Sequence, residues 1–199
     1  MKIKSYIIKH DHGFAPNPYC GFLTLATCKP RIRNSANIKD IIVATGSITR
    51  GYKNKLIYAA QVSQVIDMNK YFEDPVYQVK KPSCENDIRD NIYYRENGNW
   101  KQLNNRFHTK DDMKRDLSST KVLVCKDFWY FGREAPLLPE NFFEIVKKGP
   151  GHKNIDNINV ISGFLDWLST YGKGINGEPI DSIKKMGRYA CENRKTCCV

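Results

Sequence analysis

The chain alternates short apolar runs with polar segments, and most runs predict one element of secondary structure. Residues 2–9 alternate between polar and apolar side chains, which predicts a first strand. β-Branched apolar residues predict a second strand at 40–45 and a long strand at 56–66. The run at 22–27 is short enough to fit either a strand or a buried turn.

Helical patterns are fewer and mostly short. A proline precedes a predicted helix at 31–37, where its missing amide is tolerated. Asp67 is a suitable N-cap for a helix at 68–72, and 111–117 fits one or two helical turns. Apolar residues recur at helical spacing over 155–171, which predicts the longest helix of the chain.

The dipeptide Asn97-Gly98 is the strongest hairpin signal, because both of its residues tolerate the positive φ that a two-residue turn requires. It predicts that strands at 91–94 and 99–103 pair with each other. Two further apolar runs, 121–125 and 128–131, are separated by two polar residues. We expect these two runs to form another antiparallel pair.

These elements predict an α+β fold: a small, mostly antiparallel β-barrel with peripheral short helices and a C-terminal helix. A chain of 199 residues suits one domain, which we place at 1–175, followed by a basic, loosely ordered tail at 176–199. No apolar run approaches membrane-spanning length, and residues 1–9 lack the apolar core of a signal peptide. We therefore expect a soluble cytoplasmic protein without a membrane partner.

The seven cysteines are scattered, and their odd number and spacing favour reduced thiols. Cys28 is either a buried structural thiol or a nucleophile with a histidine near it in space; no Cys/His family signature favours the nucleophile. His10 and His12 flank Asp11 and would share one face of a strand. Because other histidines lie far along the chain, contact with a ligand is favoured over a metal site, with a purely structural role in the loop as the alternative. Neither metal nor cofactor is predicted.

Positive charge is concentrated at the start of the chain. The net charge is +11. Residues 1–60 hold ten Lys/Arg against two acids, or +8, and residues 61–199 hold 22 against 19, or +3. A local excess of this kind attracts phosphates, although a basic, merely soluble surface would show it too.

The segment 10–47 collects polar side chains at the ends of apolar strands, where binding sites are commonly built. Lys29 and Arg31 flank a predicted helix start and suit a phosphate, with a solvated basic turn as the alternative. Gly46 would let a ligand approach the backbone, with a plain turn as the alternative. The segment lacks a phosphate-loop motif. The ligand-binding candidates in this segment are His10, His12, Asn17, Thr27, Lys29, Arg31, Thr45 and Ser47.

Aromatic residues cluster at 93–100 and 128–131. Bases stack on exposed rings, although most of these rings are expected in the core. If Trp129 and its neighbour Tyr130 lie on a strand, only one of them faces inward. Tyr93 and Trp129 are therefore added as candidate stacking residues.

Several segments together resemble the nucleotide modification associated domain family, second type, over roughly residues 2–171. They are HDHGFAPNPYCGFLTLATCKPRIR, DIIVATGS, NIYY, FWYFG-x-EAP and GPGH. The first segment is long and specific, and the others are weak alone. That family is found beside DNA base-modification genes in phage and bacterial genomes. The resemblance implies a role in making, processing or reading modified nucleotides.

A looser similarity links the chain to the EVE and PUA-like modules. Arg33-Asn34-Ser35-Ala36 matches their basic segment, and an apolar strand follows it here as there. Those modules are similar to small barrels that flip a modified base into an aromatic-walled pocket. The long loop after residue 9 and the middle insert depart from their pattern.

Three functions follow from these features. The first is a module that binds a nucleotide or nucleic acid and recognises a modified base in a basic, aromatic-lined pocket. The second is an enzyme that processes a modified base or nucleotide, with Asp11 and His12 as candidate acid–base groups. The third is a phage protein that sequesters a nucleotide signal. No spacing motif establishes turnover, and none sets the oligomeric state.

Overall fold

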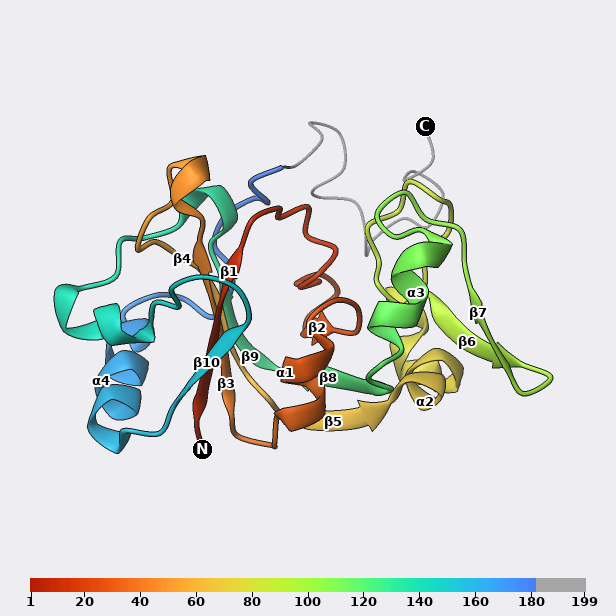
Figure 1. The fold of residues 1–199 in the computed structure, drawn as a ribbon, viewed down its shortest axis with the longest axis horizontal. Helices are drawn as coiled ribbons and strands as arrows, with labels where there is room; N and C mark the ends of the chain where they lie inside the picture. The colour runs from red at the N-terminus through yellow and green to blue at the C-terminus, as the bar shows by residue number, and fades with distance from the viewer. Residues whose placement is uncertain (182–199) are drawn as a thin grey trace.

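A computed structural model describes residues 1–181, and it contains three β-sheets and four α-helices within that range (Figure 1). The strands are β1 (Ile3–Ile8), β2 (Leu23–Leu25), β3 (Ile41–Gly46), β4 (Leu56–Gln61), β5 (Gln64–Asp67), β6 (Tyr93–Glu96), β7 (Asn99–Gln102), β8 (Lys121–Cys125), β9 (Asp127–Tyr130), β10 (His152–Ile155) and β11 (Gly174–Ile175). The helices are α1 (Pro30–Ser35), α2 (Met68–Glu73), α3 (Lys110–Asp116) and α4 (Ile158–Ser169). Four short 3₁₀ turns lie at Ile48–Arg50, Pro75–Lys80, Gly132–Glu134 and Glu140–Ile145.

The largest sheet has six strands in the order β10-β1-β3-β4-β9-β11. β1 and β3 are parallel, as are β9 and β11, and the other pairs in this sheet are antiparallel. β3 and most of β4 are buried, which explains why they read as continuous apolar runs in the sequence. α4 packs against this sheet through Ile161, Phe164 and Leu168.

A second sheet has three strands in the order β2-β8-β5 and lies beside the first (Figure 1). Two chain segments run through both sheets: β4 continues into β5, and β8 continues into β9. At the crossing, Ser63 donates its backbone N–H to the Val124 carbonyl at 2.8 Å, and its Oγ accepts the Lys126 N–H at 2.9 Å. The predicted strand at 56–66 is therefore two strands, separated at Val62 and Ser63.

A second apolar cluster supports the smaller sheet. Met68 and Tyr71 of α2 pack with Tyr93 of β6 and with Val122 and Val124 of β8. The Asp67 carboxylate accepts the amides of two residues in the first turn of α2, so the predicted N-cap is confirmed. The predicted hairpin is also confirmed, because β6 pairs with β7 and both turn residues have positive φ.

Several predictions about topology were wrong. β8 and β9 do not pair with each other: β8 lies between β2 and β5, and β9 lies between β4 and β11. The predicted helix at 155–171 begins later, because residues 152–155 form an edge strand beside β1. The mixed α+β class is confirmed, and most pairs are antiparallel, but the sheets of residues 1–181 do not close into a barrel.

Cys20 and Cys84 are disulfide-bonded, contrary to the expectation of reduced thiols, whereas Cys28 and Cys125 are free. Within the described range, no helix combines the length and apolar character needed to cross a bilayer. Most of the tail predicted at 176–199 lies outside the described residues. The described part folds back, since the Asp181 amide donates to the Asp11 carbonyl at 2.8 Å.

Candidate functional site

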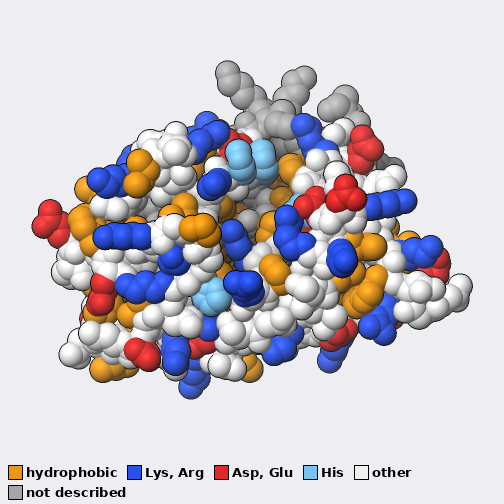
Figure 2. Space-filling model, viewed as in Figure 1, with side chains coloured by type: hydrophobic (Ala, Val, Ile, Leu, Met, Phe, Trp, Pro, Cys, Tyr) orange, Lys and Arg blue, Asp and Glu red, His pale blue; other side chains and the backbone are white. Residues whose placement is uncertain are grey.

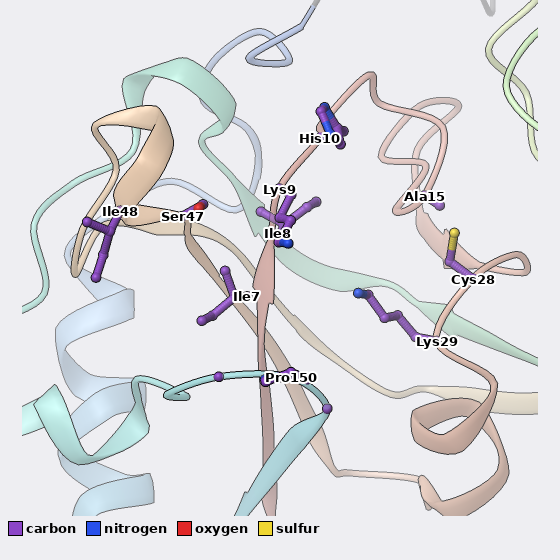
Figure 3. A pocket seen from close by; sticks show the side chains of 12 residues that line it. Ile7, Ile8, Lys9, His10, Ala15, Cys28, Lys29, Ser47, Ile48 and Pro150 are labelled. Atoms are coloured by element: carbon purple, nitrogen blue, oxygen red, sulfur yellow. The ribbon is translucent and has the colours of Figure 1, made fainter.

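A cavity of about 580 Å³ opens where β1 ends. The face that contains it is hollowed near its centre, and Lys, Arg and His side chains surround the hollow (Figure 2). The turn before α1, the end of β3 and the loop before β10 complete the wall. The lining residues are Ile7, Ile8, Lys9, His10, Ala15, Cys28, Lys29, Ser47, Ile48 and Gly149–Gly151 (Figure 3).

A second cavity of about 480 Å³ adjoins the first, since Cys28, Lys29 and Gly151 line both. It adds the cationic side chains Arg31 and Arg115. Lys29 therefore lies where the two cavities meet, and Figure 3 shows its side chain extending toward β1. Its Nζ lies 4.5 Å from the centre of the Tyr6 ring, and burial lowers its pKa.

The turn that carries Cys28 has an uncommon backbone. Cys28 and Lys29 both have positive φ, at 56° and 41°. Non-glycine residues rarely adopt this conformation, and it is found disproportionately at functional sites. The Arg33 side chain stabilises this turn, because its Nε donates to the Cys28 carbonyl at 2.8 Å.

Behind Cys28 lies a line of polar side chains that reaches into the interior. Cys28 Sγ is 3.3 Å from His108 Nε2, and His108 Nδ1 is 2.7 Å from Asp116 Oδ2. Asp116 Oδ1 accepts the Cys28 backbone N–H at 3.0 Å, and Oδ2 accepts the Tyr93 hydroxyl at 3.0 Å. Asp116 is fully buried and His108 is 8% exposed, so only Cys28 of the three lines the cavities.

This arrangement favours a protonated His108. Burial opposes the charge, but the contacts with Asp116 and Cys28 outweigh it and raise the His108 pKa to about 9. A histidine whose pKa rises on folding contributes stability below its unfolded pKa of about 6.5, and this contribution is lost as pH rises through 9.

We expect an NMR titration to give an elevated pKa for His108. Cys28→Ala should lower that pKa by roughly one unit, because it removes one of the two partners of the ring. His152 is the internal reference for this titration, because its pKa is lowered instead. Burial is the main cause, and nearby cations add to it. A His108 ring that titrates near pH 6.5 in both proteins would contradict this account.

Four of the predicted site residues line the cavities. His10, Lys29 and Ser47 line the first cavity, and Lys29 and Arg31 line the second. His12 lies beside His10, with their rings stacked at 6.4 Å, and its Nδ1 is 3.2 Å from the Asp181 carbonyl oxygen.

Asp11 and Asn17 are buried outside the cavity lining. The Asp11 carboxylate accepts the Tyr130 hydroxyl at 2.6 Å, and burial raises its pKa. Asn17 donates to two backbone carbonyls and accepts the Lys80 ammonium at 2.8 Å. Both side chains therefore hold the loop after β1 in place.

The remaining predicted residues do not line either cavity. Thr27 and Thr45 are buried, with hydroxyls that have no hydrogen-bond partner among the described residues. The Tyr93 ring is in the core, and Trp129 donates to the Tyr171 carbonyl at 3.2 Å. Gly46 allows close packing with Tyr52, since a Cβ at position 46 would lie only 2.2 Å from the Tyr52 Cβ.

His108, Asp116 and Arg115 were not among the predicted site residues, and Cys28 was considered only as an alternative. His108 and Asp116 follow Cys28 by about 80 residues or more, and no spacing motif connects them. The Gly149–Gly151 loop entered the sequence analysis only through the GPGH segment of the family resemblance. A signal was present in Thr109 and Asp112, whose capping box predicts a helix start that carries Asp116.

The fold and cavities define an α+β protein with a cationic cavity built on its N-terminal third. The chain belongs to the nucleotide modification associated domain 2 family, whose model matches residues 1–186. Its family thus associates it with nucleotide modification. Comparisons with the curated proteins and with the solved structures found no significant match.

Proposed function

We propose that the protein binds a phosphate-bearing nucleotide, free or within a nucleic acid, and recognises a modified base in the cavity at the end of β1. The observation that carries this proposal is the cavity of about 580 Å³ with Lys9, His10 and Lys29 in its wall. Its volume falls within the range of small-molecule sites. The family association with nucleotide modification supports the choice of ligand.

The two cavities divide the recognition between them. Lys29, Arg31 and Arg115 lie together at the second cavity and suit the phosphate. The first cavity offers apolar side chains, including Ile7, Ile8 and Ala15, together with the backbone of Gly149–Gly151. Neither Tyr93 nor Trp129 lines a cavity, so the proposed binding mode does not include stacking on these rings. The base would instead be recognised by hydrogen bonds to its edge and by apolar contacts.

We expect Lys29→Met to weaken nucleotide binding about tenfold. A hydrogen bond to a charged group contributes about 1.5–3 kcal/mol, and 1.4 kcal/mol is tenfold in affinity. Methionine retains an apolar stem over Tyr6 and removes only the charge. Lys53→Met is the matched control, since Lys53 is exposed and lines neither cavity. Calorimetric titration at two salt concentrations measures both effects; equal affinities of the two variants would contradict the proposal.

Binding measurements with different ligands distinguish the related functions. Binding of an oligonucleotide with a modified base, but not of its unmodified counterpart, supports a reader of nucleic acid. Tight binding of a free nucleotide without binding of polynucleotide supports sequestration of a nucleotide signal. Nucleotides that co-purify with the full chain, identified by mass spectrometry, name the ligand directly.

A nucleotide-processing enzyme is the second candidate function. The observation that favours it is the Cys28–His108–Asp116 line at the junction of the two cavities.

A further inference from the structure

We propose that Cys28 is a catalytic nucleophile, with His108 as its base and acid and Asp116 as a positioning residue, that transfers an acyl group from a phosphate-bearing substrate to water. The phosphate-bearing character of the substrate rests on the proposed function. The nucleophile itself rests on the geometry around Cys28, and nothing in the family assignment specifies it.

The thiol, the imidazole and the carboxylate follow one another in the order that proton transfer requires. The imidazole lies between the thiol and the carboxylate: Nε2 is 3.3 Å from Sγ, and Nδ1 is 2.7 Å from Oδ2 in an ion-pair contact whose N–H direction lies outside hydrogen-bond geometry. The carboxylate fixes the ring and stabilises its charged form, and the other nitrogen exchanges a proton with the nucleophile. A thiol that faces an imidazolium reacts near neutral pH.

The surroundings restrict the ring and expose the thiol. The His108 backbone is fixed at both ends, since its N–H donates to Asn105 Oδ1 at 2.7 Å and its carbonyl accepts Gln102 Nε2 at 2.7 Å. The Phe14 ring packs edge-on against the imidazole at 5.0 Å. A ligand in either cavity can therefore meet Cys28, while His108 and Asp116 remain behind it.

A metal site is the main alternative for this cluster, because one ligand atom from each residue lies within 4.8 Å of the others. The geometry disfavours it. Asp116 contacts the ring nitrogen opposite the one that faces Cys28, whereas a shared ion needs all three ligand atoms around it at about 2.0–2.3 Å. Both Asp116 oxygens also already accept hydrogen bonds, from the Cys28 amide and the Tyr93 hydroxyl.

The reaction balances with water as the only co-reactant. His108 Nε2 already holds the thiol proton, so Sγ attacks the carbonyl carbon as the thiolate, and His108 gives this proton to the leaving oxygen or nitrogen. An alcohol or amine departs, and a thioester remains on Cys28. His108 then takes a proton from water, which attacks the thioester. His108 keeps that proton while Sγ departs as the thiolate and the carboxylic acid leaves, which restores the starting pair.

The experiment uses the full-length protein and two probes that do not require the natural ligand. p-Nitrophenyl acetate reports acylation and turnover, and iodoacetamide reports thiolate reactivity, with peptide mapping to locate each adduct. We expect an acetyl group on the Cys28 peptide. His108→Gln should slow acylation about 100-fold or more, because a positioned base contributes at least this much. Lys53→Met, a change at an exposed residue that lines neither cavity, should leave the rate unchanged.

The pH profile tests the positioning role of Asp116. Alkylation of Cys28 in the unmodified protein should remain fast below neutral pH relative to glutathione in the same reaction. In His108→Gln and Asp116→Asn it should fall about tenfold per pH unit, because the thiolate fraction does so for an isolated thiol. If either variant fails to fold, the pH profile of the unmodified protein still tests the proposal. Alkylation of Cys28 that is no faster than alkylation of glutathione would overturn it.

Other outcomes overturn specific parts of it. Alkylation without release of p-nitrophenolate would refute acyl transfer. One equivalent of tightly bound zinc that blocks alkylation until a chelator is added would make the cluster a metal site. Nucleotide binding is measured separately on Cys28→Ser: if that variant binds and the unmodified protein is inert to both probes, the nucleophile is refuted and the proposed function stands.

Discussion

Replacement of Arg33 by methionine is expected to lower the free energy of unfolding by about 3–5 kcal/mol, because it leaves several buried carbonyls without a donor. The Arg33 guanidinium is fully buried on α1. It donates to the carbonyls of Cys28 at 2.8 Å, Ser119 at 2.8 Å and Lys121 at 2.7 Å, and also to that of Asp116 at 2.5 Å. One side chain thus ties the Cys28 turn to the end of α3 and the start of β8.

Chemical denaturation of Arg33→Met, Arg33→Lys and Arg31→Met measures this effect. Lysine should recover little of the loss, because one ammonium group cannot reach carbonyls that a planar guanidinium spans. Arg31 is the matched control on the same helix, and its exposed side chain should contribute less than about 0.5 kcal/mol. Equal stability of the Arg33 and Arg31 variants would show that the buried network contributes little.

Arg31 and Arg33 also show what the sequence was able to predict about the site. Both lie in one basic segment of the sequence, and the structure places Lys29 and Arg31 of this segment at a cavity. Arg33 points into the interior instead, because two residues along a six-residue helix reverse the direction of a side chain. Composition counts both charges equally, and only burial separates the cation at the cavity from the structural one.

Local sequence patterns predicted the positions of helices and strands better than they predicted which strands pair. The hairpin at 93–102 and the capped helix at 68–73 follow from turn and cap chemistry that acts within a few residues. The strands at 121–130 were also located correctly, but they were paired with each other because they are adjacent in sequence. In the structure the two strands follow one another through both sheets. Their neighbours are the strands at 23–25, 56–61, 64–67 and 174–175.

The same limit applies to the cluster around Cys28. A thiol flanked by apolar residues is most often structural, so its sequence context favoured burial. What changes this interpretation is a contact with His108, which α3 and its preceding loop bring across 80 residues. No periodicity or motif encodes a contact at this separation, so sequence reasoning allowed a nearby histidine and had no means of naming it.

Replacement of Lys80 by methionine should destabilise the protein by about 3 kcal/mol or more at neutral pH, because several buried oxygens would lose their donor. Lys80 is fully buried. Its ammonium donates to Asn17 Oδ1 at 2.8 Å and to the carbonyls of Asn17 at 3.1 Å, Tyr19 at 2.6 Å and Phe22 at 2.8 Å. These oxygens belong to the loop that leads from the cavity to β2, so the variant should loosen that loop first.

The pH dependence of Lys80→Met distinguishes the buried charge from the lost hydrogen bonds. Burial lowers the Lys80 pKa to about 7, whereas an unfolded lysine titrates near 10.4. Between these values the unfolded chain binds more protons, so Lys80 makes unfolding less favourable as pH rises. The stability difference between the unmodified protein and Lys80→Met should therefore grow by about 2 kcal/mol from pH 7 to pH 9. Lys70→Met, at an exposed lysine of α2, should show no such change, and a difference that shrinks with pH would mean that folding favours the charged ammonium.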